Sequence, residues 1–170
     1  MTDPQLKITS IRSGICHDSE TQLDVLLTIQ PPEAKLNSDR PAVNLGLVLD
    51  RSGSMSAEGK MSFARDAAMF AVRQLLPTDR VSVTAFDDTV CVEVPSTLVS
   101  DPDAILDVIR SINPDGGTAL HDGWKVGASQ VGSHFNASCL NRVILLSDGE
   151  ANVGEANSDV IATDVKQKAR

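Results

Sequence analysis

Residues 43–50, with the sequence Val-Asn-Leu-Gly-Leu-Val-Leu-Asp, decide the fold of this chain of 170 residues. The run is almost continuously apolar and ends at an aspartate, which is typical of a central parallel strand that is buried on both faces. A loop of small polar residues, Arg51 to Ser54, follows directly. Because such a strand needs helices on both faces of its sheet, this stretch predicts an α/β protein.

Outward from residue 50, helical and strand patterns alternate. Apolar residues recur at helical spacing from Met61 onward, and a Ser-Asp-Pro-Asp start at residues 100–103 predicts a second helix. The predicted elements are a helix from residue 61, strands at 81–86 and 90–94, a helix from 102, a helix after 118, a strand at 142–147 and a helix beginning at 158. Their order, β-α-β-β-α-α-β-α, predicts a Rossmann-like open sheet that is mostly parallel, with its binding site at the carboxyl ends of the strands.

The amino-terminal part of the chain has a different pattern. Residues 5–12 and 22–30 predict two strands, and the second ends at Pro31-Pro32, which cannot continue a hydrogen-bonded ladder. Residues 31–41 form a polar, proline-containing stretch that predicts a linker. We therefore divide the chain into a short β segment with its linker, residues 1–41, and a main domain, residues 42–170.

Composition and charge narrow the classes of partner. The formal net charge is -8, so phosphate backbones and anionic membrane surfaces are repelled and neither nucleic acid nor membrane is an expected partner. Neither a signal peptide nor an apolar run long enough to cross a bilayer is present, which predicts a cytoplasmic protein. The three cysteines fit neither a disulfide framework nor a paired metal motif, and we interpret them as reduced thiols.

Oxygen-bearing side chains follow two of the buried strands. Asp50 and Asp148 stand at the carboxyl ends of apolar strands, Thr118 lies in a glycine-rich loop before a helix, and Ser52 and Ser54 alternate with Asp50 so that all three face one way. All five should meet at one edge of the sheet. Two carboxylates and three hydroxyls form an oxygen-only set, which favours Mg²⁺, Mn²⁺ or Ca²⁺ over zinc. We predict a divalent-metal site whose open position takes an Asp or Glu from a partner protein.

Other interpretations of the same residues stay open at this stage. A strand-end Asp is commonly a turn former, and Ser52 and Ser54 could cap a helix. His121 and Asp122 could reach a ligand from the rim, although polar residues are ordinary in the first turns of a helix. A metal-dependent hydrolase and a scaffold with a stabilising metal are the alternative functions. No His or Lys stands ready as a general base, so we expect no enzyme.

Three segments resemble the metal-site motifs of von Willebrand factor type A domains, and bacterial members in particular. They are LVLDRSGSMS at 47–56, DGGTALHDG at 115–123 and VILLSDGEANVG at 143–154. The resemblance implies a metal-ion-dependent adhesion site. In such a site the hydroxyls of Ser52, Ser54 and Thr118 would contact the ion, which is most favourably Mg²⁺. Asp50 and Asp148 would contact it directly or through water.

The same resemblance bears on partners and on the completeness of the sheet. Family members mostly bind proteins and do not catalyse, and bacterial relatives commonly pair with AAA-type ATPases or chelatase subunits. Further strands, each with a helix, usually follow the fourth sheet strand, which ends here at Asp148. We therefore expect an incomplete sheet at Arg170, with an exposed edge that another chain completes or that favours self-association.

Overall fold

The computed structural model describes residues 5–10, 25–30, 40–149 and 152–168, and the chain divides into two compact units, Met1–Arg40 and Pro41–Arg170. In the first unit, β1 (Gln5–Ser10) pairs antiparallel with β2 (Val25–Gln30). The short amino-terminal β segment expected from the sequence is therefore present, and the predicted strand ends at residues 11–12 and 22–24 lie outside the described residues. Most of the predicted linker, residues 31–39, lies outside the described residues.

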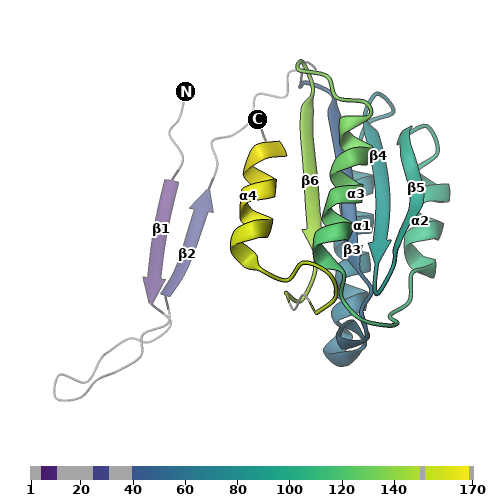
Figure 1. Cartoon of the computed structure of the whole chain (residues 1–170). Helices are drawn as coiled ribbons and strands as arrows, with labels where there is room; N and C mark the ends of the chain where they lie inside the picture. The colour runs from purple at the N-terminus through teal and green to yellow at the C-terminus, as the bar shows by residue number, and fades with distance from the viewer. Residues whose placement is uncertain (1–4, 11–24, 31–39, 150–151, 169–170) are drawn as a thin grey trace. The chain divides into compact units, whose positions relative to one another are not determined.

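A four-stranded sheet forms the centre of the second unit, in the order β5-β4-β3-β6 (Figure 1). The central strand β3 is parallel to both of its neighbours, whereas β5 pairs antiparallel with β4. The strands are β3 (Val43–Asp50), β4 (Arg80–Phe86), β5 (Val90–Leu98) and β6 (Leu140–Leu146). The prediction of an open, mostly parallel sheet is confirmed. Its buried strands are β3 and β4, whereas β6, which the sequence predicted to be buried, is partly exposed because it is the edge strand of the described sheet.

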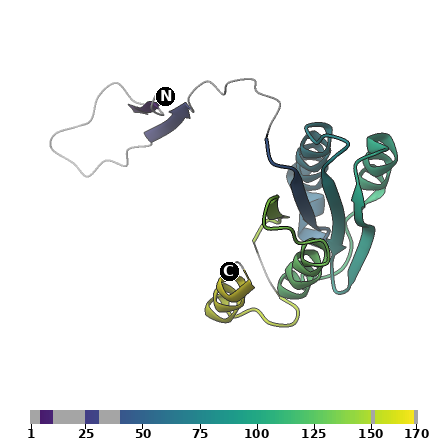
Figure 2. The same ribbon diagram turned by 90° about the horizontal axis from the view of Figure 1, so that it is seen from above.

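Helices cover both faces of this sheet (Figures 1 and 2). Two of them, α1 and α2, lie on one face, and α3 lies on the other, with α4 on the same side as α3. The helices are α1 (Lys60–Arg73), α2 (Pro102–Ser111), α3 (Leu120–Gly132) and α4 (Ser158–Lys168). A short 3₁₀ segment that the sequence did not predict, η1 (Gly53–Gly59), precedes α1.

Side chains along β3 alternate between the two layers of the core. Leu45, Leu47 and Leu49 belong to the buried apolar cluster that contains residues of α1 and α2. The intervening residues face α3, since a Cβ added at Gly46 would lie 2.8 Å from Val131 Cγ2. The strand is thus buried on both faces, which explains its continuous apolar sequence.

The helix α3 approaches the sheet closely because it presents glycines to it. A Cβ at Gly127 would lie 2.2 Å from Val48 Cγ2, and a Cβ at Gly123 would lie 2.5 Å from Phe86 Cδ1. Only glycine allows backbone and side chain to pack at these distances. This contact fixes where α3 starts, and therefore where the loop containing Thr118 meets the sheet.

Candidate functional site

The central aspartate of the site ends β3. Asp50 is fully buried, and its Oδ1 accepts a hydrogen bond of 2.8 Å from the backbone N–H of Ser52. Its Oδ2 accepts one of 2.6 Å from the hydroxyl of Ser147, the residue that follows β6. The carboxyl ends of β3 and β6 are therefore joined through the side chain of Asp50.

Two serine hydroxyls continue from Asp50 toward Asp148. Ser52, which is 1% exposed, comes directly before η1, and its Oγ lies 3.1 Å from Ser54 Oγ. The hydroxyl of Ser54 also lies near the carboxylate of Asp148 and helps to lower its pKa. The structure thus brings four of the predicted residues, Asp50, Ser52, Ser54 and Asp148, into one connected group.

The fifth predicted residue, Thr118, is brought to the group by its loop. The backbone N–H of Gly53 donates to the carbonyl oxygen of Gly116 at 2.9 Å, and the N–H of Asp115 donates to the carbonyl of Arg51 at 2.6 Å. These bonds hold the two loops side by side. Thr118 itself is 1% exposed.

Sequence reasoning missed two residues that shape the Thr118 loop. Asn152 Oδ1 accepts a hydrogen bond of 2.8 Å from the N–H of Thr118, and Asp88 Oδ1 accepts one of 2.9 Å from the N–H of Gly117. A Cβ at Gly117 would lie 2.2 Å from Asp88 Oδ1, so this loop requires glycine there. Asp88 follows the end of β4, so this bond joins it to a loop distant in sequence. No local pattern signals such a contact.

An ion pair anchors the loop that runs from Arg51 to Ser54. Arg51 Nη2 lies 2.6 Å from Asp87 Oδ2, and Asp87 Oδ1 also accepts hydrogen bonds from the N–H and hydroxyl of Thr89. Burial by itself raises the pKa of Asp87, but the hydrogen bonds from Thr89 and the charge of Arg51 outweigh it and lower the pKa below 3.8. Asp87 therefore stays ionised and holds the Arg51 side chain.

One lysine, Lys60, reaches the site. Lys60 Nζ donates a hydrogen bond of 2.9 Å to Asp148 Oδ2. The bond from Lys60 and the hydroxyl of Ser54 hold the pKa of Asp148 below 3.8. Because an ammonium paired with a carboxylate is protonated, Lys60 is a poor general base in this arrangement.

The donor set fits a hard divalent cation. Across the described ranges no group of three or more His, Cys, Asp or Glu side chains could hold a metal, and the predicted set consists of two carboxylates and three hydroxyls. The Oδ1 atom of Asp148 is buried and accepts no hydrogen bond from the described residues. A buried carboxylate oxygen without a partner is costly, and a cation would satisfy it. Oxygen donors of this kind suit Mg²⁺ or Ca²⁺.

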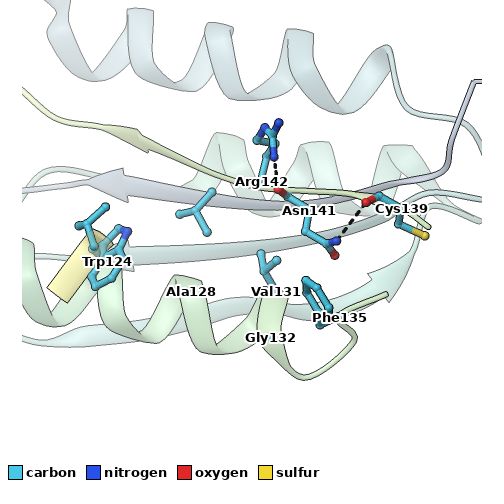
Figure 3. Close-up of a pocket in the computed structure, with 10 residues that line it drawn as sticks. Trp124, Ala128, Val131, Gly132, Phe135, Cys139, Asn141 and Arg142 are labelled. Carbon is cyan, nitrogen blue, oxygen red and sulfur yellow. Dashed lines mark hydrogen bonds between the residues drawn. The ribbon is translucent and has the colours of Figure 1, made fainter. Parts of the chain in front are cut away.

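His121 does not face the rim of the site. It is 4% exposed, its Nε2 lies 3.1 Å from Asp164 Oδ2 of α4, and its ring stacks on Trp124. The contact therefore joins α3 to α4. Beside it lies a cavity of about 410 Å³ between α3, β6 and α4, and Figure 3 shows Trp124 and Phe135 at its wall. This cavity is lined mainly by apolar side chains and includes none of the five predicted metal residues.

Comparisons with known proteins agree with this fold. The sequence profile of the von Willebrand factor type A domain matches residues 45–150. An uncharacterised protein of Synechocystis is 33% identical over 116 residues, which are 68% of this chain and 27% of that protein. An uncharacterised Escherichia coli protein, YfbK, is 26% identical over 132 residues, 78% of this chain and 23% of that protein. The chain spans about a quarter of the length of these relatives.

Solved structures share the fold. A von Willebrand factor type A protein from Catenulispora acidiphila superimposes with a TM-score of 0.60 at 20% identity, covering 98% of this chain and 38% of that one. The corresponding domain of the type V pili tip protein Mfa5 from Porphyromonas gingivalis gives 0.59 at 22% identity, covering 67% of this chain and 40% of that one. None of the helices in the described residues is long and apolar enough to cross a membrane.

Proposed function

The chain belongs to the von Willebrand factor type A family, and from that premise we propose that its strand-edge site binds a divalent cation and uses it to capture an acidic side chain of a partner protein. Domains of this family are generally protein-interaction or adhesion modules. Pilus proteins are among the solved structures with the same fold. Together with the donor set at the strand edge, this favours a binding role over catalysis.

Each predicted ligand has a distinct part in this proposal. The hydroxyls of Ser52, Ser54 and Thr118 would contact the ion, and Asp50 and Asp148 would hold it directly or through water. Mg²⁺ is the favoured ion, with Mn²⁺ and Ca²⁺ as alternatives. Because hydroxyls carry no charge, the bound ion keeps an affinity for one more anion. The carboxylate of a partner's Asp or Glu would complete the coordination.

One observation carries the proposal. Asp148 Oδ1 is a buried carboxylate oxygen without a hydrogen-bond donor among the described residues, while Oδ2 of the same side chain accepts a hydrogen bond from Lys60. The hydroxyl of Ser52 lies within 3.1 Å of that of Ser54. A bound cation would satisfy this oxygen, and its place beside the serine hydroxyls supports a metal site here.

The identity and location of the partner stay predictions. An AAA-type ATPase or chelatase subunit in the cytoplasm is the partner expected from the sequence resemblance, while the pilus relatives are named for surface structures. Self-association through β6, the edge strand of the described sheet, is a further expectation. There Leu140 and Ile144 are each 41% exposed.

Calorimetric titration with MgCl₂ tests the metal site on the protein alone. We expect saturable binding to the wild-type protein and binding at least about tenfold weaker in the double variant Ser52→Ala/Ser54→Ala, since even outer-shell changes cost about that much. Ser111→Ala is the matched control, because this exposed serine in α2 bonds only a local carbonyl. Equal Mg²⁺ affinity in the double variant and the control would contradict the assignment of the ligands.

Two further readouts separate the alternatives. Binding to immobilised peptides that carry a single Glu, compared with the same peptides carrying Gln, reports capture of an acidic group. Mg²⁺ that raises the melting temperature without any preference for Glu would favour a scaffold whose metal only stabilises the fold. Hydrolysis of a phosphoester that rises with Mg²⁺ occupancy would favour the metal hydrolase.

A further inference from the structure

Lys60 places a positive charge against one of the two carboxylates of the site. It is the first residue of α1, its side chain is 37% exposed, and the Asp148 side chain that it contacts is 14% exposed. Its Nζ bonds Oδ2, while Oδ1 of the same carboxylate lacks a partner among the described residues. The lysine therefore neutralises Asp148 and leaves one of its oxygens available.

The backbone before α1 fixes where this ammonium lies. Glu58 and Gly59 both have positive φ angles, 53° and 72°, in the left-handed region. This turn ends η1 and lets α1 begin at Lys60. Because Gly59 adopts the left-handed conformation without steric cost, the start of the helix is well defined. The contact between Lys60 and Asp148 thus joins the first turn of α1 to the residues after β6.

The other cation near the site is already neutralised. Arg51 is paired with Asp87 at 2.6 Å, and Asp87 is not among the predicted ligands. Among the five ligands only Asp50 and Asp148 carry charge, so their formal sum is -2, and Lys60 brings the group to -1. A bound divalent cation would make the group +1 with Lys60 and neutral without it.

We propose that Lys60 is an internal counter-ion of the metal site, which weakens binding of the divalent cation and strengthens binding of an acidic partner to the loaded site. This inference rests on the proposed function. Lys60 and the cation compete for the negative charge of Asp148, so the lysine lowers metal affinity. Once the ion is bound, the remaining positive charge attracts a carboxylate. By linkage, the partner's carboxylate then raises the affinity for the ion, so metal and partner bind cooperatively.

Three variants test this proposal. Lys60→Met keeps the aliphatic stem and removes the charge, and Lys60→Arg keeps the charge. Lys125→Met is the matched control, since Lys125 is 42% exposed and lies 3.8 Å from Asp164, which is not a predicted ligand. The control makes the same change in net charge, so a general effect of the acidic surface on Mg²⁺ cancels. Circular dichroism establishes that each variant is folded.

The expected results concern the affinity for Mg²⁺, the affinity for the Glu peptide and the melting temperature. Lys60→Met binds Mg²⁺ about fivefold more tightly than the wild-type protein, the change that a partly exposed ion pair can supply. In saturating Mg²⁺ it binds the Glu peptide more weakly than the wild type does. Without metal it melts at a lower temperature than Lys125→Met. Lys60→Arg and Lys125→Met keep the wild-type affinities for both Mg²⁺ and peptide.

The failures of the two proposals are distinguishable. If the wild-type protein binds Mg²⁺ and the Glu peptide, and Lys60→Met binds both with the same affinities, the role of Lys60 is overturned and the metal site stands. If neither protein binds Mg²⁺ while Lys60→Met still melts below Lys125→Met, the pair is a structural ion pair. That result overturns both the metal site and the role of Lys60.

Discussion

The close contact between α3 and the central strand gives a sharp prediction about packing. In Gly127→Ala the new Cβ would lie 2.2 Å from Val48 Cγ2, well inside van der Waals contact. Val48 is fully buried in the central strand of the sheet, so its side chain has no room to move aside. The helix must therefore shift away from the sheet, or the core must deform.

Two opposing effects set the change in unfolding free energy that Gly127→Ala causes. An added methyl group in a well-packed core costs about 1–3 kcal/mol of unfolding free energy. Replacing glycine by alanine inside a helix returns about 1 kcal/mol through helix propensity. Because a contact of 2.2 Å is severe, the overpacking cost should lie in the upper part of that range, about 2–3 kcal/mol, and we expect Gly127→Ala to lower the free energy of unfolding by about 1–2 kcal/mol. In Gly132→Ala, at the end of the same helix, the new Cβ has nothing within 4 Å. That variant should be as stable as the wild type or slightly more stable.

Urea unfolding followed by circular dichroism measures both changes, and a double variant identifies the contact responsible. Val48→Ala alone removes two buried methyl groups and should cost about 2–3 kcal/mol. Because it also removes the clashing atom, Gly127→Ala/Val48→Ala should cost less than the sum of the single changes by about 1–2 kcal/mol. A Gly127→Ala protein at least as stable as the wild type, or strictly additive costs, would refute this account of the packing.

Three further predictions concern polar groups away from the ligands. Asp79 is fully buried and accepts hydrogen bonds from the N–H groups of Val43 and Leu76. Asp79→Ala should therefore lower the free energy of unfolding, measured in urea, by about 2–4 kcal/mol. Asp103 is exposed, and Asp103→Ala should change this free energy by less than about 0.5 kcal/mol. The pKa of Asp87 is lowered in the folded state, so its stabilising contribution is fully present above the ordinary value of 3.8 and is lost as the pH falls through the folded pKa. The difference in thermal stability between the wild type and Asp87→Asn should accordingly shrink on acidification below 3.8, and a difference constant with pH would contradict it. Asp164→Ala removes the partner of both His121 and Lys125, so amide hydrogen exchange should accelerate across α4 and stay unchanged in β3. Unaltered protection of α4 would show that other contacts hold the helix.

The order of elements followed from the sequence because burial leaves a local pattern. The continuous apolar run of β3 reflects helices on both of its faces, and the cap at Asp101 accepts a hydrogen bond from Ala104 as its sequence suggests. Ends of elements were less predictable. The 3₁₀ segment η1 is kinked at Ala57 and Glu58, and Glu58 adopts a positive φ that its residue type does not favour.

The candidate ligands were also visible in the sequence, since parallel strands place their carboxyl ends at one edge. The residues that hydrogen-bond these ligands could not be predicted from the sequence. Ser147 bonds a residue 97 positions away, Lys60 bonds one 88 positions away and Asn152 bonds one 34 positions away. Such contacts follow from how the layers pack and leave no periodic signal. For the same reason the sequence did not indicate that Lys60 reaches the site.

The most direct test of the central claim is the binding of one pair of peptides, with Glu or Gln at the same position, measured in Mg²⁺ and again in chelator. Thr118→Val serves as the variant, because it removes only the hydroxyl from a buried side chain of the same shape. The account predicts that the wild-type protein prefers the Glu peptide in Mg²⁺ and loses that preference in chelator, and that Thr118→Val shows it in neither. An equal preference for Glu in Mg²⁺ and in chelator would contradict the claim that a bound cation captures an acidic group at this edge of the sheet.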